Sequence, residues 1–256
     1  SKSRNRSMRG CALMLPRPVV EQHAGVLVVR DDLLPGGTKM RAILPLMQAQ
    51  AAAEFVYASP AQGYAQVALA HCARHLGRRA TVFTAARRVP HPLTLAAAQA
   101  GAKVVPVPCG YLSVVQSRAR AYAADRGAFL IPFGAEDAAS LQSIAQAAIT
   151  TGLQPREVWS VAGSGVLTRA LQLAWPQAQF VAVVVGREGC DTGRARRIVH
   201  PLPFGRMAKV LPPFPSAAGY DAKAWEYIRA EAKPGALFWN VGASKTGRSG
   251  KALTQC

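Results

Sequence analysis

The regular alternation of short apolar segments with longer helical ones is the feature that most constrains the fold of this chain. Between residues 25 and 186, segments rich in Val, Phe and Ala are each followed by an Ala-rich or amphipathic stretch. This alternation is typical of βαβ units, in which helices join parallel strands and cover both faces of the sheet. We therefore expect an α/β fold built from parallel sheets.

Hydrophobic periodicity and turn residues set the expected boundaries of the elements. We expect strands at 25–30, 54–59, 79–85, 103–108, 128–134, 157–165, 179–186 and 236–242. We expect helices at 38–53, 65–77, 92–102, 112–127, 137–152, 166–175 and 221–232. Pro45 should kink or break the first of these helices. The Arg- and Pro-rich segment 187–220 follows no clear period, which is typical of functional or flexible segments.

Length, hydropathy and cysteine usage exclude several classes of protein. The chain has 256 residues, 50% of them hydrophobic, which suffices for one large α/β domain or two modest lobes. It contains no apolar run long enough for a membrane span, and its basic N-terminus lacks the apolar segment of a signal peptide. Five scattered cysteines without CxxC spacing argue against a disulfide framework and a structural metal site. We expect a cytoplasmic protein without a membrane or metal partner.

The net charge is the unusual bulk property of the chain. Lys and Arg number 31 against 13 Asp and Glu, a formal net charge of +18. Such a field favours a nucleic-acid partner, since each neutralised phosphate releases counterions. The alternative is a basic composition without a functional role. Because no helix-turn-helix, zinc-finger or RNP motif accompanies the charge, we expect contacts to the nucleic-acid backbone. The candidate residues are Arg87, Arg88, Arg194, Arg196, Arg197, Lys245 and Arg248, with a basic flexible arm at 1–15.

A lone lysine, Lys39, follows a Pro-Gly-Gly turn in the stretch DDLLPGGTKMR and opens a predicted helix. Three interpretations are open for it. Lys39 is a solvated residue of the first helical turn, a phosphate-binding lysine, or an amine held close to backbone so that it can react.

A second glycine turn, AGSG at residues 162–165, ends an apolar segment and is followed at once by a predicted helix. The N–H groups and the helix dipole at such a turn form an anion site, to which the hydroxyls of Ser164 and Thr168 would add donors. The alternative is steric, because a tight strand-to-helix turn requires glycine. The turn is neither a Walker loop nor a complete GxGxxG motif, because Thr168 stands at the third glycine position.

Taken together, the motifs have a familiar order. The stretch VLVVRDDLLPGGTKMR resembles the lysine segment of fold-type II pyridoxal-phosphate (PLP) enzymes, and is most similar to the D-cysteine desulfhydrase and aminocyclopropane-carboxylate (ACC) deaminase group. Further blocks resemble that group in the same order: VYASPAQGYAQVALAHCARHLGRRATVF, AGAKVVPV, AFLIPFGAED, VAGSGVLTRAL and ALFWNVGAS. The resemblance covers most of residues 16–186 and 236–243.

The resemblance implies a two-lobed fold and a PLP cofactor. It implies that Lys39 forms the Schiff base with PLP and that the glycine pair before it lets backbone approach the cofactor. It gives the cofactor phosphate to Gly163, Ser164, Gly165 and Thr168. Asp31 and Asp32 are expected to be structural, capping the turn or pairing with Arg41.

Two positions depart from the family pattern. Where relatives have an Asn at the phenolic oxygen of the cofactor, this chain offers Gln62 or Tyr64. Where relatives have a Ser or Thr near the pyridine nitrogen, it has Val241, flanked by Asn240. Ser59, Gln62 and Tyr64 lie in the loop that binds the substrate carboxylate in relatives, and Tyr64 is expected either to take part in catalysis with Lys39 or to form an aromatic wall.

The resemblance also sets the expected domains and oligomeric state. A small α/β domain is expected at approximately 43–125, and a large cofactor-binding domain at 16–42 plus 126–256. The family implies a homodimer.

Three functions remain open from the sequence. The leading hypothesis combines the charge with the cofactor: a PLP enzyme that, through an external aldimine, decarboxylates or otherwise remodels an amino acid attached to a modified base in DNA, as in phage thymidine hypermodification. Such an enzyme must take the base out of the stack or act on single strands. The second is a small-molecule amino-acid lyase or deaminase similar to D-cysteine desulfhydrase. The third is a non-catalytic nucleic-acid-binding module on a degenerate PLP fold.

Overall fold

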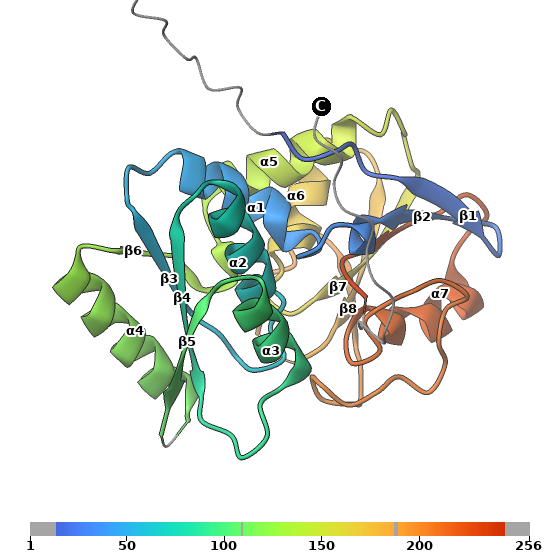
Figure 1. Cartoon of the computed structure of the whole chain (residues 1–256). Coiled ribbons are helices and arrows are strands. Elements are labelled where there is room, and N and C mark those ends of the chain that lie inside the picture. Colours follow the sequence, from blue (N-terminus) through green and yellow to red (C-terminus); the bar gives the residue numbers. More distant parts are fainter. Residues whose placement is uncertain (1–13, 109, 187–188, 244–256) are drawn as a thin grey trace, which may run out of the picture.

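Two sheets form the framework of the chain (Figure 1). The computed structural model describes residues 14–108, 110–186 and 189–243. The larger sheet has the strand order β1-β2-β10-β7-β8-β9 and the smaller sheet has the order β5-β4-β3-β6. All neighbouring strands are parallel except β1 and β2. The predicted α/β class with parallel sheets is confirmed. The strands are β1 (Val20–His23), β2 (Val26–Arg30), β3 (Glu54–Ala58), β4 (Arg79–Ala85), β5 (Lys103–Val107), β6 (Phe129–Leu130), β7 (Glu157–Ala162), β8 (Gln179–Val184), β9 (Arg196–Val199) and β10 (Leu237–Asn240).

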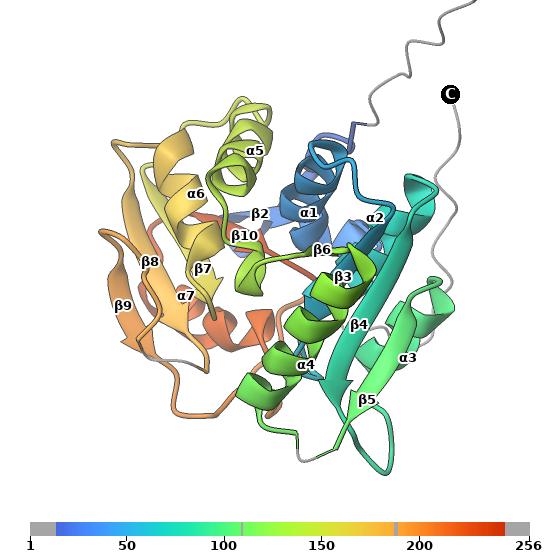
Figure 2. The same ribbon diagram turned by 90° about the vertical axis from the view of Figure 1, so that its left-hand side faces the viewer.

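Helices fill the space between the sheets and cover their outer faces. Buried side chains of α1, α2, α5 and α6, such as Ile43, Leu69 and Leu171, form one core cluster with the inner faces of both sheets. Figure 2 shows α4 against the smaller sheet, and α5 and α6 beside β7 and β8. Within the described residues, none of the helices has the length and hydropathy needed to cross a membrane. The helices are α1 (Lys39–Gln48), α2 (Ala65–His75), α3 (Pro92–Gln99), α4 (Leu112–Arg126), α5 (Ala138–Ile149), α6 (Val166–Ala174) and α7 (Trp225–Glu231).

The strand β2 shows how the sequence produces this layering. Val26 and Val28 pack into the cluster that contains α7, whereas Val29 packs into the cluster between the sheets. Successive side chains of a strand point to opposite faces, so a strand covered on both faces is apolar at nearly every position. The run VLVVR meets this requirement and becomes a central strand.

Several predicted elements differ from the structure. The expected strand 128–134 is reduced to the two residues of β6, and the turn at 133–135 follows it, because Pro132 and Gly134 favour a turn. β6 pairs with β3, so the smaller sheet extends past residue 125. Helix α1 continues through Pro45 and ends at Gln48 instead of 53. The short strands β1 and β9 were not predicted, because VEQH and RRIV lack an apolar run.

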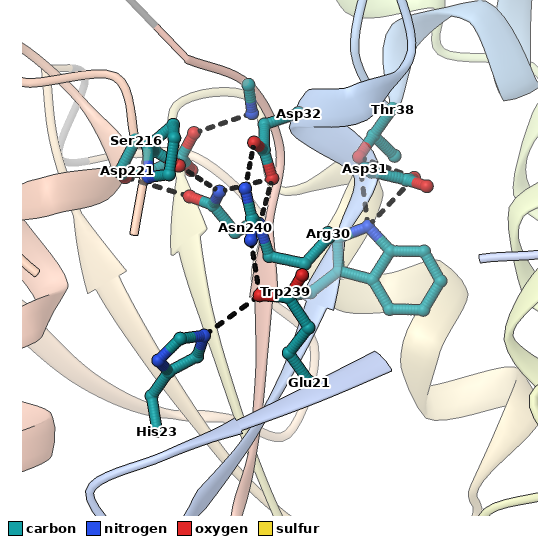
Figure 3. Close-up of polar contacts among 12 residues, drawn as sticks. Glu21, His23, Arg30, Asp31, Asp32, Thr38, Ser216, Asp221, Trp239 and Asn240 are labelled. Carbon is teal, nitrogen blue, oxygen red and sulfur yellow. Dashed lines mark hydrogen bonds and ion pairs between the residues drawn. The ribbon is translucent and has the colours of Figure 1, made fainter. Parts of the chain in front are cut away.

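A buried ion pair between Asp31, directly after β2, and Arg41 of α1 lies close in sequence to the predicted reactive lysine. Figure 3 shows Asp31 with two further partners, Thr38 and Trp239 of β10. The carboxylate of Asp31 accepts bonds from Arg41 Nη2 at 2.7 Å and from Arg41 Nε. It also accepts bonds from Thr38 Oγ1 at 2.9 Å and from Trp239 Nε1 at 3.1 Å. Asp31, Arg41 and Thr38 are buried. The expectation that Asp31 is structural and pairs with Arg41 is confirmed.

Replacing Asp31 by Ala is expected to destabilise the chain by about 3–5 kcal/mol, because the Arg41 guanidinium would stay buried without its counter-ion. The measurement is the free energy of unfolding from denaturant titration. The matched control is Asp125→Ala, which removes an exposed ion pair with Arg126 and is expected to cost at most about 1 kcal/mol. Equal losses in the two variants would contradict this role of Asp31.

Candidate active site

A cavity of about 410 Å³ lies between the two sheets, at the carboxyl ends of their strands. The larger lobe contributes the start of α1, the turn between β7 and α6, and the strand ends at 185–186 and 241. The smaller lobe contributes the loop 60–65 and the start of α4. Open parallel sheets bind ligands at this edge, because the connecting loops there leave a crevice.

Lys39 is the first residue of α1 and its side chain enters this cavity. Its Nζ donates a hydrogen bond to the carbonyl oxygen of Gly134 at 2.5 Å. Burial lowers the pKa of Lys39 from 10.5 to about 8, although the carboxylate of Glu136 opposes this shift. A sizeable fraction of the amine is therefore neutral near physiological pH, which is the nucleophilic form.

Gly134 links Lys39 to the smaller sheet and to the GSG turn. Its N–H donates to the hydroxyl oxygen of Tyr57 at 3.3 Å, while its carbonyl accepts the bond from Lys39. Burial raises the pKa of Tyr57 to about 12, so the phenol remains protonated. Gly134 has φ 74°, and a Cβ there would lie 3.0 Å from the Cβ of Ser164. Gly134 and Tyr57 were not predicted as site residues. The turn in AFLIPFGAED could have indicated Gly134, whereas no motif indicated Tyr57.

The pair Gly36 and Gly37 permits a close approach of protein segments, a steric reason for glycine beside the expected approach to the cofactor. A Cβ on Gly36 would lie 2.4 Å from the Cα of Ala68 in α2. A Cβ on Gly37 would lie 2.3 Å from the carbonyl oxygen of Val241. The glycines therefore let the turn before Lys39 pack directly against α2 and the end of β10.

The turn Gly163-Ser164-Gly165 lines the same cavity as Lys39. It joins β7 to α6, and Gly165 has φ 81°, with its Cβ position only 1.7 Å from the carbonyl oxygen of Asp191. Only glycine fits there. The first N–H groups of α6 have no partner within the helix, and the helix dipole favours a negative charge at this end. The turn therefore has the geometry of an anion site that faces the lysine.

Thr168 does not contribute to this anion site, which corrects the prediction. It is fully buried, and its hydroxyl lies 2.9 Å from that of Ser160 in β7. Its neighbour Leu167 lines the cavity instead. Thr168 lies on the face of α6 that packs on the sheet, so its hydroxyl joins helix to strand.

The loop after β3 places two of its three predicted residues in the cavity. Gln62 and Tyr64 line it, whereas Ser59 is buried and donates to the carbonyl of Pro60 at 2.8 Å. Ser59 therefore stabilises the loop and is not a cavity residue. The hydroxyl of Tyr64 donates to the carbonyl of Ala243, and burial raises its pKa. Tyr64 is thus a neutral donor and aromatic wall in this structure.

Asn240 lies outside the cavity, contrary to the prediction that it binds the cofactor. Its Nδ2 donates to Asp32 at 2.8 Å and to the carbonyl of Pro215 at 2.9 Å. Its Oδ1 accepts from Ser216 at 2.8 Å (Figure 3). The next residue, Val241, lines the cavity. Asn240 therefore attaches the segment around residue 215 to the end of β10.

A buried carboxyl group that the sequence did not indicate lies beside this strand end. Asp221 is fully buried, and its Oδ2 accepts the N–H of Gly242 at 3.0 Å. Its Oδ1 has no hydrogen-bond partner among the described residues. Burial raises the pKa of Asp221 well above its usual range. No motif surrounds Asp221, and only its position in the fold reveals it.

The arginines predicted to contact nucleic acid fall into two groups. Arg87, Arg88, Arg194, Arg196 and Arg197 are all exposed. Arg194, however, donates to three carbonyls just after α6, one of them at 2.6 Å, and Arg196 pairs with Glu231 at 2.7 Å. These two guanidinium groups are bound within the chain, which argues against their predicted role. Lys245, Arg248 and residues 1–13 of the basic arm lie outside the described residues.

Comparison with solved structures shows the fold. The chain is similar to an ACC deaminase homologue, with a TM-score of 0.74 and 16% identity over 85% of this chain and 84% of that chain. It is similar to a threonine deaminase from T.th., with a TM-score of 0.65 and 17% identity over 88% and 89%. It is also similar to a pyridoxal 5'-phosphate-dependent aspartate racemase, with a TM-score of 0.53 and 17% identity over 84% and 68%. No protein-family model and no curated protein matches the chain.

The reactivity of the Lys39 amine is expected to rise with a midpoint near pH 8 in the folded chain, because burial lowers its pKa to about 8. The measurement is carbamylation of Lys39 by cyanate as a function of pH, followed by mass spectrometry of the peptide. The control is the same lysine in the chain unfolded by guanidinium chloride, where the midpoint should return towards 10.5. Identical midpoints in the folded and unfolded chain would contradict the effect of burial.

Proposed function

We propose that this chain, which has the fold of the fold-type II pyridoxal-phosphate enzymes, binds PLP at Lys39 and acts on a free amino acid as a lyase of the deaminase type. One observation carries the proposal. A lysine whose pKa is lowered to about 8 by burial and an anion site at the start of α6 line a single cavity. An aldehyde cofactor with a phosphate group requires these two features together.

The residues present fit this cofactor. Gly163, Ser164 and Gly165 line the cavity at the start of α6, where N–H groups without a partner in the helix can bind a phosphate. When bound, PLP supplies an electron sink for the bonds at the Cα atom of an amino acid.

The side chains of the cavity have distinct roles in the proposed reaction. Lys39 holds the cofactor covalently. Once substrate has displaced it, the Nζ amine accepts and returns a proton, for which its pKa of about 8 is suited. The amide of Gln62 and the backbone of its loop offer donors for the substrate carboxylate. Phe133 and Phe204 form apolar walls that exclude water.

Deamination is favoured over decarboxylation by two considerations. A lysine amine that moves a proton at Cα is required for elimination, whereas the loss of carboxylate begins without a base at that atom. Several similar structures are those of deaminases and an ammonia lyase by name. The particular amino acid is a separate question.

The variant Lys39→Ala is expected to abolish the visible absorbance that the wild-type chain acquires with PLP. The measurement is the absorption spectrum, with borohydride reduction and mass spectrometry to place the added mass on the Lys39 peptide. Lys209→Ala, which removes an exposed lysine, is the matched control and should retain the spectrum. A wild-type chain that remains colourless with added PLP would exclude the cofactor and favour the non-catalytic nucleic-acid module.

A second candidate, remodelling of an amino acid attached to DNA, is favoured by the net charge of +18. We expect such a chain to be retained on DNA, with an affinity that falls steeply as the salt concentration rises. Arg87→Ala should reduce the slope of log affinity against log salt by about 1, if this exposed side chain contacts a phosphate. Arg229→Ala, an exposed arginine on α7, is the control. The absence of DNA binding at low ionic strength would remove this candidate.

A further inference from the structure

A second cavity, of about 200 Å³, adjoins the candidate active site. Tyr57, Gln116 and Phe133 line both cavities, so the two meet at these side chains. The remaining lining residues are Ala58 at the end of β3, residues 130–132 at and after the end of β6, and Arg120 of α4. A ligand bound in the larger cavity can therefore extend into the second one.

The topology of the smaller sheet makes this a favoured place for a ligand. From β3 the chain adds β4 and then β5 on one side, whereas β6 is added on the other side of β3. The strand order therefore reverses between β3 and β6, and the carboxyl ends of strands at such a point favour a crevice. Ala58 ends β3 and Ile131 follows β6, and both line the second cavity.

Arg120 gives the second cavity a cation. It lies four residues after Gln116 on α4, so both side chains lie on one face of the helix. Among the described residues, no carboxylate lies within ion-pair distance of Arg120. The neighbouring Arg126, by comparison, pairs with Asp125 and lies over the ring of Tyr122.

The larger cavity differs in charge. Among its described lining residues, Lys39 is the one charged side chain, and the proposed reaction uses it. The walls around it are aromatic, aliphatic or neutral and polar. An anionic group on the far end of a substrate would therefore find its counter-ion in the second cavity.

We propose that the second cavity binds the distal carboxylate or phosphate of the substrate side chain, with Arg120 as its ion-pair partner and Gln116 as an additional donor. The inference rests on the proposed function and specifies its substrate class as amino acids with an anionic side-chain end. A guanidinium group binds carboxylate and phosphate with two parallel N–H donors. Arg120 is exposed, so its guanidinium group is accessible to such a ligand, and Leu130, Ile131 and Pro132 line the same cavity.

The experiment titrates the PLP-loaded chain with amino acids and follows the change in the cofactor absorbance. The anionic ligands are glutamate, 2-aminoadipate and O-phosphoserine, and their neutral counterparts are the isosteric glutamine, and norleucine and serine, which lack the anionic group. At least one anionic ligand is expected to bind about tenfold more tightly than its neutral counterpart. Aminoadipate against O-phosphoserine separates a carboxylate from a phosphate preference.

Two arginine variants test the assignment of the cation. Arg120→Gln is expected to remove the preference for the anionic ligand and to leave the affinity for norleucine unchanged. Arg118→Gln is the matched control, since Arg118 is exposed on the same helix and lines neither cavity. Equal affinities for anionic and neutral ligands in the wild-type chain, or equal losses in both variants, would overturn the proposal.

Failure of the proposed function gives a different result from failure of this inference. A chain that acquires no absorbance with PLP contradicts the proposed function alone. Calorimetric titration with glutarate then tests the second cavity without a cofactor, and binding that Arg120→Gln removes would support it. A chain whose absorbance responds to neutral amino acids without an anionic preference retains the proposed function and loses this inference.

Discussion

The position of Lys39 depends on a buried ion pair. Asp31 is the first residue after β2, and Arg41 lies in the first turn of α1, only two residues after Lys39. Trp239 of β10 and Thr38 bond to the same carboxylate, so two strands and a helix meet there. Moving Asp31 and Arg41 apart would leave an unpaired buried charge, which is strongly unfavourable. The segments that carry these two residues are therefore held in one arrangement. The turn that presents Lys39 to the cavity is fixed as a consequence.

The sequence was sufficient to predict the parallel α/β class, most of the strands, and the presence of Lys39 and the GSG turn in one site. These features depend on local pattern and on motif order. Side-chain direction was less predictable: Thr168 and Ser59 have suitable hydroxyl groups, but both bond within the protein. Asp221 was missed because its role depends on contact with the end of β10, which is remote in the sequence. Only the tertiary structure brings those segments together.

Part of the large positive charge has a structural use. Arg78 and Arg194 donate to backbone carbonyls at or just beyond the ends of α1 and α6, and Arg17 donates to Thr150 directly after α5. The last carbonyls of a helix lack partners within it, and cations near that end also stabilise the helix dipole. Some of the arginine side chains thus stabilise the C-terminal ends of helices. The net charge alone is a weaker indication of a polyanionic partner than the sequence suggested.

The bond between Lys39 and Gly134 couples chemistry to the arrangement of the lobes. The amine belongs to α1, whereas Gly134 follows β6 and is attached to β3 through Tyr57. Any reaction that converts the amine to an imine removes N–H donors from this nitrogen, and so alters its contact with the carbonyl of Gly134. The covalent state of one nitrogen atom therefore affects a contact that joins the two sheets.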